Sequence, residues 1–291
     1  RGNDKKECRK GGVANGMDHE EFMEKVKAAD ILISNFKKGD DVKLSITDTI
    51  LRKANPNLII AKITGFGLDS DRVAYDLILQ AESGFMSING EKNAGPLKMP
   101  VALIDVLAAH QLKEAILLAL LHRHTEGEAK TVHVSLYDAA VCSLTNQASN
   151  YLMTNNSPQR LGNLHPNIAP YGEIFKTKDD KQITFAIGSN RHFVDLCSSL
   201  QLDIIEEQDF ATNQLRVQNR EKLETLIQQK VEHVDSNQLM NKLHDLNVPC
   251  AFIKNIKEVL DSKMSQDLIR SESIDGEPTS RITSIGFKWI D

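Results

Sequence analysis

Two short apolar segments constrain the fold of this chain more than any other feature of its sequence. Residues 30–34 (DILIS) have the length and apolar character of a short strand, and 58–67 (LIIAKITGFG) have those of a buried strand that runs into a glycine turn. Each follows a helical pattern, at 18–29 and at 42–54, after a short connection. The order helix–strand–helix–strand with short links is typical of a parallel sheet that is covered by helices. The sequence therefore predicts an α/β fold.

The pattern of elements changes near residue 155. Before that point, a helical pattern at 101–124, a strand at 131–136 and a helix at 138–153 continue the α/β order. A polar stretch rich in proline and asparagine follows, and then apolar and polar residues alternate on both sides of Asp179-Asp180, which indicates a β-hairpin. The later elements are three helical patterns and one short strand, at 190–200, 218–231, 236–246 and 248–253. We expect a larger α/β domain followed by a smaller α+β domain.

Composition and charge argue against several functions. A net charge of −5 provides no strong basic field that would attract nucleic acid or acidic lipid. The most apolar run, 101–121, contains Asp105, His110 and Lys113, so it is expected to be a core helix rather than a membrane span. No pair of the four cysteines has the spacing of metal ligands, and no signal peptide is recognised. We therefore expect a cytoplasmic protein with reduced thiols and without a metal site.

A glycine-punctuated loop at 84–98 (GFMSINGEKNAGPLK) raises the question of chemistry. It holds one carboxylate, Glu91, and two residues later an amide, Asn93. A carboxylate can act as the nucleophile in acyl transfer, whereas an amide oxygen is a feeble one. An ordinary exposed polar loop explains the same residues without any reaction. The loop alone leaves both interpretations open.

Six segments of the chain occur in the order that is seen in one enzyme family. They are ADILISNFKKG, NPNLIIAKITGFG, AYDLILQAESGFMSINGE, VHVSLYDAAV, GNLHPNIAPYGEIFKTKDDKQITFAIGSNRHF and NVPCAFIKNIKEVL. With these segments the chain resembles the family III CoA-transferases, which include formyl-CoA transferase and carnitine CoA-transferase. The resemblance covers nearly the whole chain, from Met17 to Arg281. It implies a Rossmann-like large domain, a smaller domain and a homodimer of two interlocked chains.

The resemblance also implies where the domains begin and end. It indicates a large domain at 1–153, a linker at 154–170, a small domain at 171–265 and a return linker toward the large domain at 266–291. Family members open with a strand and a turn that contacts CoA, and this first unit has no counterpart before Asp18. We therefore expect the large domain to be incomplete at its N-terminal end.

A CoA site must neutralise a 3′-phosphate and a pyrophosphate, which requires cations or helix N-termini. Lys37 and Lys38 follow a predicted strand, at the edge where ligands bind in parallel-sheet folds. The resemblance favours phosphate binding over a pair of solvated lysines. It implies CoA as a substrate, with no permanently bound cofactor. The CoA-binding residues that it implies are Phe36, Lys37, Lys38, Thr64, Gly65, Phe66, Gly67 and Tyr75.

Racemase activity is not expected, although α-methylacyl-CoA racemases are relatives of this family. Those relatives have a His-Asp pair at the positions of Tyr75 and Asp76. Racemisation needs a base on each face of the α-carbon, and tyrosine is a poor base near neutral pH. Asp76 is better explained as an acid at a helix N-terminus, where it interacts favourably with the helix dipole.

The resemblance implies a covalent mechanism in the loop. In the transferases an aspartate attacks the acyl-CoA carbonyl, and the enzyme passes through an anhydride and a CoA thioester. The ungapped register from Gly90 puts Asn93 at the position of that aspartate. Three explanations remain open: Glu91 substitutes for the aspartate, Asn93 is an engineered or inactivating change, or the chain binds CoA without transferase chemistry.

The function predicted from the sequence is transfer of CoA from an acyl-CoA to a small carboxylic acid, with Glu91 and Asn93 as the candidate catalytic positions. A catalytically weakened CoA-binding homologue is one alternative, and a partner-binding α/β protein without enzymatic activity is another. The expected partners are an acyl-CoA, a carboxylic acid and a second copy of the chain. Neither nucleic acid nor a membrane is expected.

Overall fold

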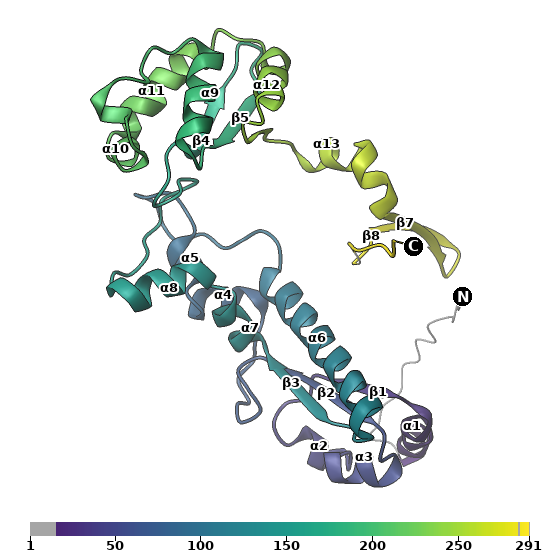
Figure 1. The fold of residues 1–291 in the computed structure, drawn as a ribbon. Coiled ribbons are helices and arrows are strands. Elements are labelled where there is room, and N and C mark those ends of the chain that lie inside the picture. The colour runs from purple at the N-terminus through teal and green to yellow at the C-terminus, as the bar shows by residue number, and fades with distance from the viewer. Residues whose placement is uncertain (1–15, 285, 291) are drawn as a thin grey trace. The chain divides into compact units, whose positions relative to one another are not determined.

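The computed structural model describes residues 16–284 and 286–290. The chain forms two compact units that divide between Gly162 and Asn163, and Figure 1 shows the fold of each. This division lies inside the predicted connection 154–170. Among the described residues, no helix is both long enough and apolar enough to cross a membrane.

The first unit is built on a three-stranded parallel sheet. β1 (Ile31–Ser34), β2 (Ile59–Thr64) and β3 (Thr131–Ser135) lie in the order β1-β2-β3, so β2 is the central strand. Residues 58–61, at the start of β2, are at most 1% exposed, which explains why that segment is continuously apolar. The parallel pairing of strands that were predicted from such runs confirms the α/β fold class.

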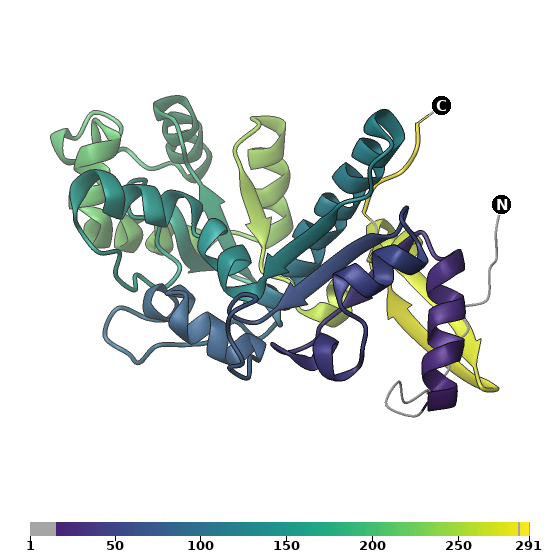
Figure 2. The same ribbon diagram turned by 90° about the horizontal axis from the view of Figure 1, so that it is seen from below.

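Helices cover this sheet. α6 (Leu103–Glu126) packs along β2 and β3, as Figure 2 shows. The residue that caps its C-terminal end, Gly127, has a φ of 75°, the left-handed conformation common at helix C-termini. The other described helices of the unit are α1 (Gly16–Ala28), α2 (Asp40–Lys43), α3 (Asp48–Ala54), α4 (Asp76–Glu82), α5 (Phe85–Ile88), α7 (Leu136–Cys142) and α8 (Thr145–Thr154).

Two helices that the sequence predicts as continuous are interrupted. The pattern at 42–54 becomes α2 and α3, with Ser45 at a φ of 54° between them. The pattern at 138–153 becomes α7 and α8, and Thr145 has a φ of 44° at the junction. Positive φ values are uncommon at serine and threonine, which do not mark a turn in the sequence as glycine does. The breaks were therefore not predictable from residue type.

Two apolar clusters hold the first unit together. One joins α1, α3 and β2 through Val26, Ile46, Leu51, Leu58 and Ile60. The other is formed by Leu79, Ile104 and Ala140, and Phe66 and Phe85 pack against it. Because Phe66 belongs to the turn that follows β2, the second cluster fixes that turn at the end of the central strand.

The second unit is a small α+β fold. Its antiparallel sheet has the order β4 (Tyr171–Lys176), β5 (Gln182–Ala186), β6 (Cys250–Phe252), and β4 and β5 form the hairpin predicted around Asp179-Asp180. Its helical elements are α9 (Asn190–Leu200), η1 (Gln208–Phe210), α10 (Asn213–Gln218), α11 (Arg220–Val231) and α12 (Ser236–Asp245). Its apolar core contains Phe175, Phe185 and Phe193, and the guanidinium of Arg216, a residue that is 1% exposed, lies 4.4 Å from the centre of the Phe193 ring.

The last described part of the chain contains a hairpin that the sequence did not predict. It follows α13 (Ile256–Leu260) and η2 (Lys263–Leu268), and it pairs β7 (Ile269–Ile274) with β8 (Glu277–Ile282). The sequence indicates only a return linker at 266–291. Most hairpin side chains are exposed, so the alternation of apolar and polar residues that reveals a strand is absent.

Candidate functional site

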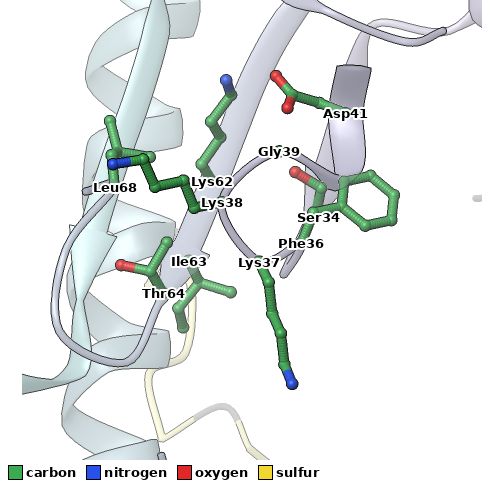
Figure 3. Close-up of a pocket in the computed structure, with 10 residues that line it drawn as sticks. All are labelled: Ser34, Phe36, Lys37, Lys38, Gly39, Asp41, Lys62, Ile63, Thr64 and Leu68. Carbon is green, nitrogen blue, oxygen red and sulfur yellow. The ribbon is translucent and has the colours of Figure 1, made fainter. Parts of the chain in front are cut away.

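A pocket of about 260 Å³ lies at the carboxyl ends of two neighbouring strands, β1 and β2. In open parallel sheets this edge is where ligands bind. Figure 3 shows the side chains that surround it. The lining residues are Ser34, Phe36, Lys37, Lys38, Gly39, Asp41, Lys62, Ile63, Thr64 and Leu68. Three of them are lysines, and one is an acid.

Lys37 and Lys38, the predicted phosphate ligands, lie on the loop between β1 and α2. Nζ of Lys38 donates to the carbonyl oxygen of Asp69 at 3.4 Å and lies 3.8 Å from Oδ1 of the same residue. The Lys37 ammonium has no partner among the described residues, while its backbone N–H donates to Oδ2 of Asp40 at 3.2 Å. The two side chains extend in different directions (Figure 3). Both remain accessible to an anion.

Lys62 is a third cation of this pocket, and the sequence analysis did not identify it. Its Nζ lies 2.7 Å from Oδ1 of Asp48, and its side chain is 21% exposed, against 58% for Lys38. Oδ2 of Asp48 also accepts a hydrogen bond from Oγ1 of Thr131. The signal that could have revealed Lys62 is a single charge in the otherwise apolar strand IIAKIT, since a half-buried charge requires a partner.

Thr64 ends β2 and anchors the turn that follows. Its Oγ1 accepts a hydrogen bond from the N–H of Gly67 at 3.1 Å and lies 2.8 Å from Nε2 of His133 on β3. Burial lowers the pKa of His133 below its usual 6.5; the charge of Lys62 adds to this effect, and Asp138 opposes it. The imidazole is therefore neutral at pH 7, and it ties the end of β2 to β3.

The two glycines of the turn have different physical roles. A Cβ on Gly65 would lie 2.2 Å from Cβ of Ala74, so the packing of that segment requires glycine whether or not a ligand binds. Gly67 has a φ of 105°, and no atom lies within 4 Å of the position its Cβ would take. Gly67 is thus the residue of this pair whose backbone is open to close approach.

Phe66 and Tyr75 do not line the pocket. The guanidinium of Arg72 lies 4.0 Å from the centre of the Phe66 ring, and the ring packs on the cluster below the turn. This arrangement accounts for Phe66 as a packing residue. Tyr75 directly precedes α4 and is 72% exposed. Its ring is free to contact a ligand.

Asp76 acts as a structural clamp between α4 and α6. Its Oδ1 accepts a hydrogen bond from the N–H of Ile104 at 2.8 Å, and its Oδ2 accepts one from the fully buried Gln80. Gln80 in turn accepts a hydrogen bond from the N–H of Met99. Partial burial, with a contribution from the Asp76 charge, raises the pKa of Asp105. These contacts agree with the interpretation of Asp76 as a helix-terminal acid.

The loop with Glu91 and Asn93 has a defined conformation. The N–H of Leu97 donates to the carbonyl of Asn89 at 3.0 Å, and Nδ2 of Asn89 donates back to the carbonyl of Leu97 at 2.8 Å. Between these anchors, the N–H of Ala94 donates to the carbonyl of Glu91 at 3.1 Å, which forms a turn with Asn93 in it. Glu91 and Asn93 are exposed, and neither side chain has a hydrogen-bond partner among the described residues.

The predicted site residues fall into two groups. Phe36, Lys37, Lys38 and Thr64 line one pocket. Gly65, Phe66, Gly67, Tyr75, Glu91 and Asn93 lie outside its lining. Within the described residues there is no cluster of three or more histidine, cysteine, aspartate or glutamate side chains that could hold a metal ion.

Comparison with known proteins gives consistent matches. The family model described as CoA-transferase family III matches residues 14–288. A succinate–glutarate CoA-transferase of Agrobacterium fabrum is 36% identical over 80% of this chain and 59% of its own length. A succinyl-CoA:mesaconate CoA-transferase of Haloarcula marismortui is 31% identical over 86% of this chain and 64% of its own length. The chain thus spans less than two thirds of either relative.

Solved structures share the fold. A CaiB/BaiF family protein from Brucella suis superposes with a TM-score of 0.81 at 30% identity, over 97% of this chain and 74% of that protein. A Mycobacterium tuberculosis protein superposes with a TM-score of 0.84 at 24% identity, over 96% of this chain and 76% of that protein. These likenesses show the fold, and the family model over residues 14–288 confirms the resemblance seen in the sequence: the chain belongs to CoA-transferase family III.

Proposed function

We propose that this chain is part of an enzyme that moves CoA from an acyl-CoA to a small carboxylic acid. The observation that carries the proposal is the family match over residues 14–288. The lysine-lined pocket at the carboxyl edge of the sheet supports it, because Lys37, Lys38 and Lys62 suit the phosphates of CoA. The named relatives act on succinate, glutarate and mesaconate. Short dicarboxylates are therefore the first acids to test.

The carboxylate of Glu91 is the proposed nucleophile. It attacks the thioester carbonyl and the carbon–sulfur bond breaks. CoA thiolate departs, and a mixed anhydride between Glu91 and the donor acid remains. The thiolate then attacks the glutamyl carbonyl, which releases the donor acid and leaves a thioester between enzyme and CoA. The acceptor carboxylate attacks this thioester and expels CoA thiolate, which leaves a second mixed anhydride. The thiolate then attacks the acceptor carbonyl of this anhydride, which forms the new acyl-CoA and regenerates the Glu91 carboxylate. Each step exchanges one acyl bond for another, so no oxidant or further reactant is needed.

A second candidate function follows from Asn93. The family resemblance puts the nucleophilic aspartate of the transferases at this position, and an amide cannot form the anhydride. A catalytically weakened CoA-binding homologue is the function that this residue favours. In that case the wild-type chain binds CoA but exchanges it very slowly, and Asn93→Asp restores exchange.

Exchange of CoA between succinyl-CoA and glutarate, followed by chromatography of the CoA esters, separates the two candidates. If Glu91 reacts, wild-type protein turns over and Glu91→Gln abolishes exchange while CoA binding stays nearly intact. If the position of Asn93 reacts, wild-type protein is nearly inactive and Asn93→Asp is active. Mass spectrometry after treatment with acyl-CoA and hydroxylamine locates the activated carboxyl group. Robust turnover that survives Glu91→Gln in the wild-type background would refute both assignments.

The assembly and location of the protein are also proposals. We infer an interlocked homodimer from the family resemblance, with the four-part division at 1–153, 154–170, 171–265 and 266–291. Light scattering tests the dimer, and a stable monomer at micromolar concentration would contradict it. A cytoplasmic location is supported by the thiols of Cys142, Cys197 and Cys250, which are free, as expected in a reducing compartment.

A further inference from the structure

Two residues of one segment, Arg160 and Gly162, lie against the loop that carries Glu91 and Asn93. Arg160 and Gly162 both make hydrogen bonds to the backbone of this loop or of the helix before it. They are more than 60 residues away from it in the chain, so only the fold brings them together. The segment belongs to the same compact unit as the loop.

Arg160 links α5 to the end of the turn. Its Nη1 donates to the carbonyl of Ser87 at 3.1 Å, and its Nε donates to the carbonyl of Ala94 at 3.2 Å. These two carbonyls lie on either side of Glu91 and Asn93 in the sequence. The half-buried guanidinium has no carboxylate partner among the described residues, so its charge is not neutralised by an ion pair. A single rigid group thus links the helix before the loop to the residue that closes the turn.

Gly162 provides the surface on which the Glu91 carboxylate lies. The N–H of Gly162 donates to the carbonyl of Gly90 at 2.9 Å. A Cβ on Gly162 would lie 2.6 Å from Oε2 of Glu91 and 3.1 Å from its Oε1. Gly162 also has a φ of 61°, a conformation that other residues rarely adopt. Any side chain at this position would displace the carboxylate.

Gly90 completes the arrangement from the side of the loop. It has a φ of 126°, and a Cβ there would lie 2.9 Å from the carbonyl oxygen of Gly95 and 3.2 Å from Cδ of Arg160. Glycine at 90 therefore leaves room for the Arg160 side chain, and glycine at 162 leaves room for the Glu91 carboxylate.

We infer that Arg160 and Gly162 are positioning residues of the CoA-transfer reaction, an inference that rests on the proposed function. Arg160 holds the reactive turn, and Gly162 leaves room for the Glu91 carboxylate. Attack on a thioester requires the nucleophile to be held within a fraction of an ångström of a productive geometry.

The test compares Arg160→Met, Arg160→Lys and Gly162→Ala in whichever parent exchanges CoA, wild type or Asn93→Asp. Arg160→Met is expected to lower kcat by about 100-fold, because a displacement near 1 Å has that effect, with KM and CoA affinity within about twofold of the parent. Arg160→Lys keeps the charge but cannot reach both carbonyls, so an intermediate kcat is expected. Gly162→Ala should lower kcat strongly in a parent that reacts through Glu91.

Arg123→Met is the matched control. Arg123 is likewise partly buried, donates to the backbone carbonyl of Asn57 at 2.7 Å and pairs with Asp30, away from the loop. Arg160→Met and Arg123→Met should lower Tm by similar amounts, while only Arg160→Met should lower kcat. Equal kcat values for Arg160→Met and the parent would overturn the inference, as would a kcat loss of the same size in Arg123→Met.

A second measurement keeps the inference testable if no parent turns over, an outcome that would count against the proposed function alone. Carbodiimide labelling of Glu91, read by peptide mass spectrometry, reports how the carboxylate is held without any catalysis. Gly162→Ala and Arg160→Met should each change the labelling rate of Glu91 several-fold, whereas Arg123→Met should not. Unchanged labelling in both loop variants would refute the positioning role even in an inactive protein.

Discussion

Replacing Lys62 with methionine should weaken CoA binding more than the same change at Lys38. Methionine preserves most of the apolar stem and removes only the ammonium group. The Lys62 side chain is 21% exposed and that of Lys38 is 58% exposed, although both line the pocket. A charge that is shielded from water interacts more strongly with a phosphate than an exposed one does. The expected order of the two losses in CoA affinity therefore follows from the burial of the two side chains, since each variant removes one charge.

The expected magnitudes follow from the same geometry. A charge-assisted hydrogen bond contributes about 1.5–3 kcal/mol, which corresponds to about a 10- to 150-fold change in Kd. Because Lys62 already pairs with Asp48 at 2.7 Å, a phosphate must share the ammonium, so we expect the lower end of that range, about tenfold. Exposed ion pairs contribute about 0.2–1 kcal/mol, so Lys38→Met should weaken binding by at most about fivefold. Asp48 keeps its hydrogen bond from Thr131, so the Lys62 variant should fold.

Isothermal titration calorimetry with CoA and with dephospho-CoA provides the measurement. Lys53→Met is the control, since Lys53 is an exposed lysine of α3 that does not line the pocket. If Lys62 binds the 3′-phosphate, its replacement should matter less for dephospho-CoA than for CoA. The reasoning would be refuted if Lys62→Met bound CoA as tightly as Lys53→Met, or if Lys38→Met lost more affinity than Lys62→Met.

Two further predictions concern the turn at the end of β2. Gly65→Ala should lower the free energy of unfolding by about 1–3 kcal/mol, the usual cost of overpacking, because the new Cβ would lie 2.2 Å from Cβ of Ala74. Denaturant titration measures this loss. Gly67→Ala is the comparison, because its Cβ would meet no atom within 4 Å and only its backbone would be strained. His133 has a lowered pKa, so below about pH 6.5 the unfolded chain binds more protons there than the folded one, and stability should fall as the pH drops through this window. The stability difference between wild type and His133→Gln should then decrease on acidification below pH 6.5, and a difference that is constant between neutral and acidic pH would contradict the assignment.

The sequence by itself determined the fold class and most of the elements that frame the site. The strands at 30–34 and 58–67 were predictable as continuous apolar runs, but only the start of β2 is fully buried; β1 lies at the edge of the sheet, and its Ile33 is 60% exposed. The β4–β5 hairpin was predictable for the complementary reason, since one of its faces is buried and the other exposed. The order of six segments was enough to indicate the family, which the family model then confirmed. The resemblance named Phe36, Lys37, Lys38 and Thr64 as CoA-binding residues, and these four line one pocket.

Only the tertiary structure decided how individual side chains are used. In the sequence, Lys62 is an unexplained charge within an apolar strand. In the structure, Oδ1 of Asp48 on α3 lies 2.7 Å from its Nζ and pairs with it. Gly65 suggests a ligand site in the sequence, yet it is required by Ala74. Arg160 gives no signal at all, because its two carbonyl partners are backbone atoms, which every residue has. Contacts between a side chain and a distant backbone leave no trace in residue type, so the support of the reactive loop could be found only in three dimensions.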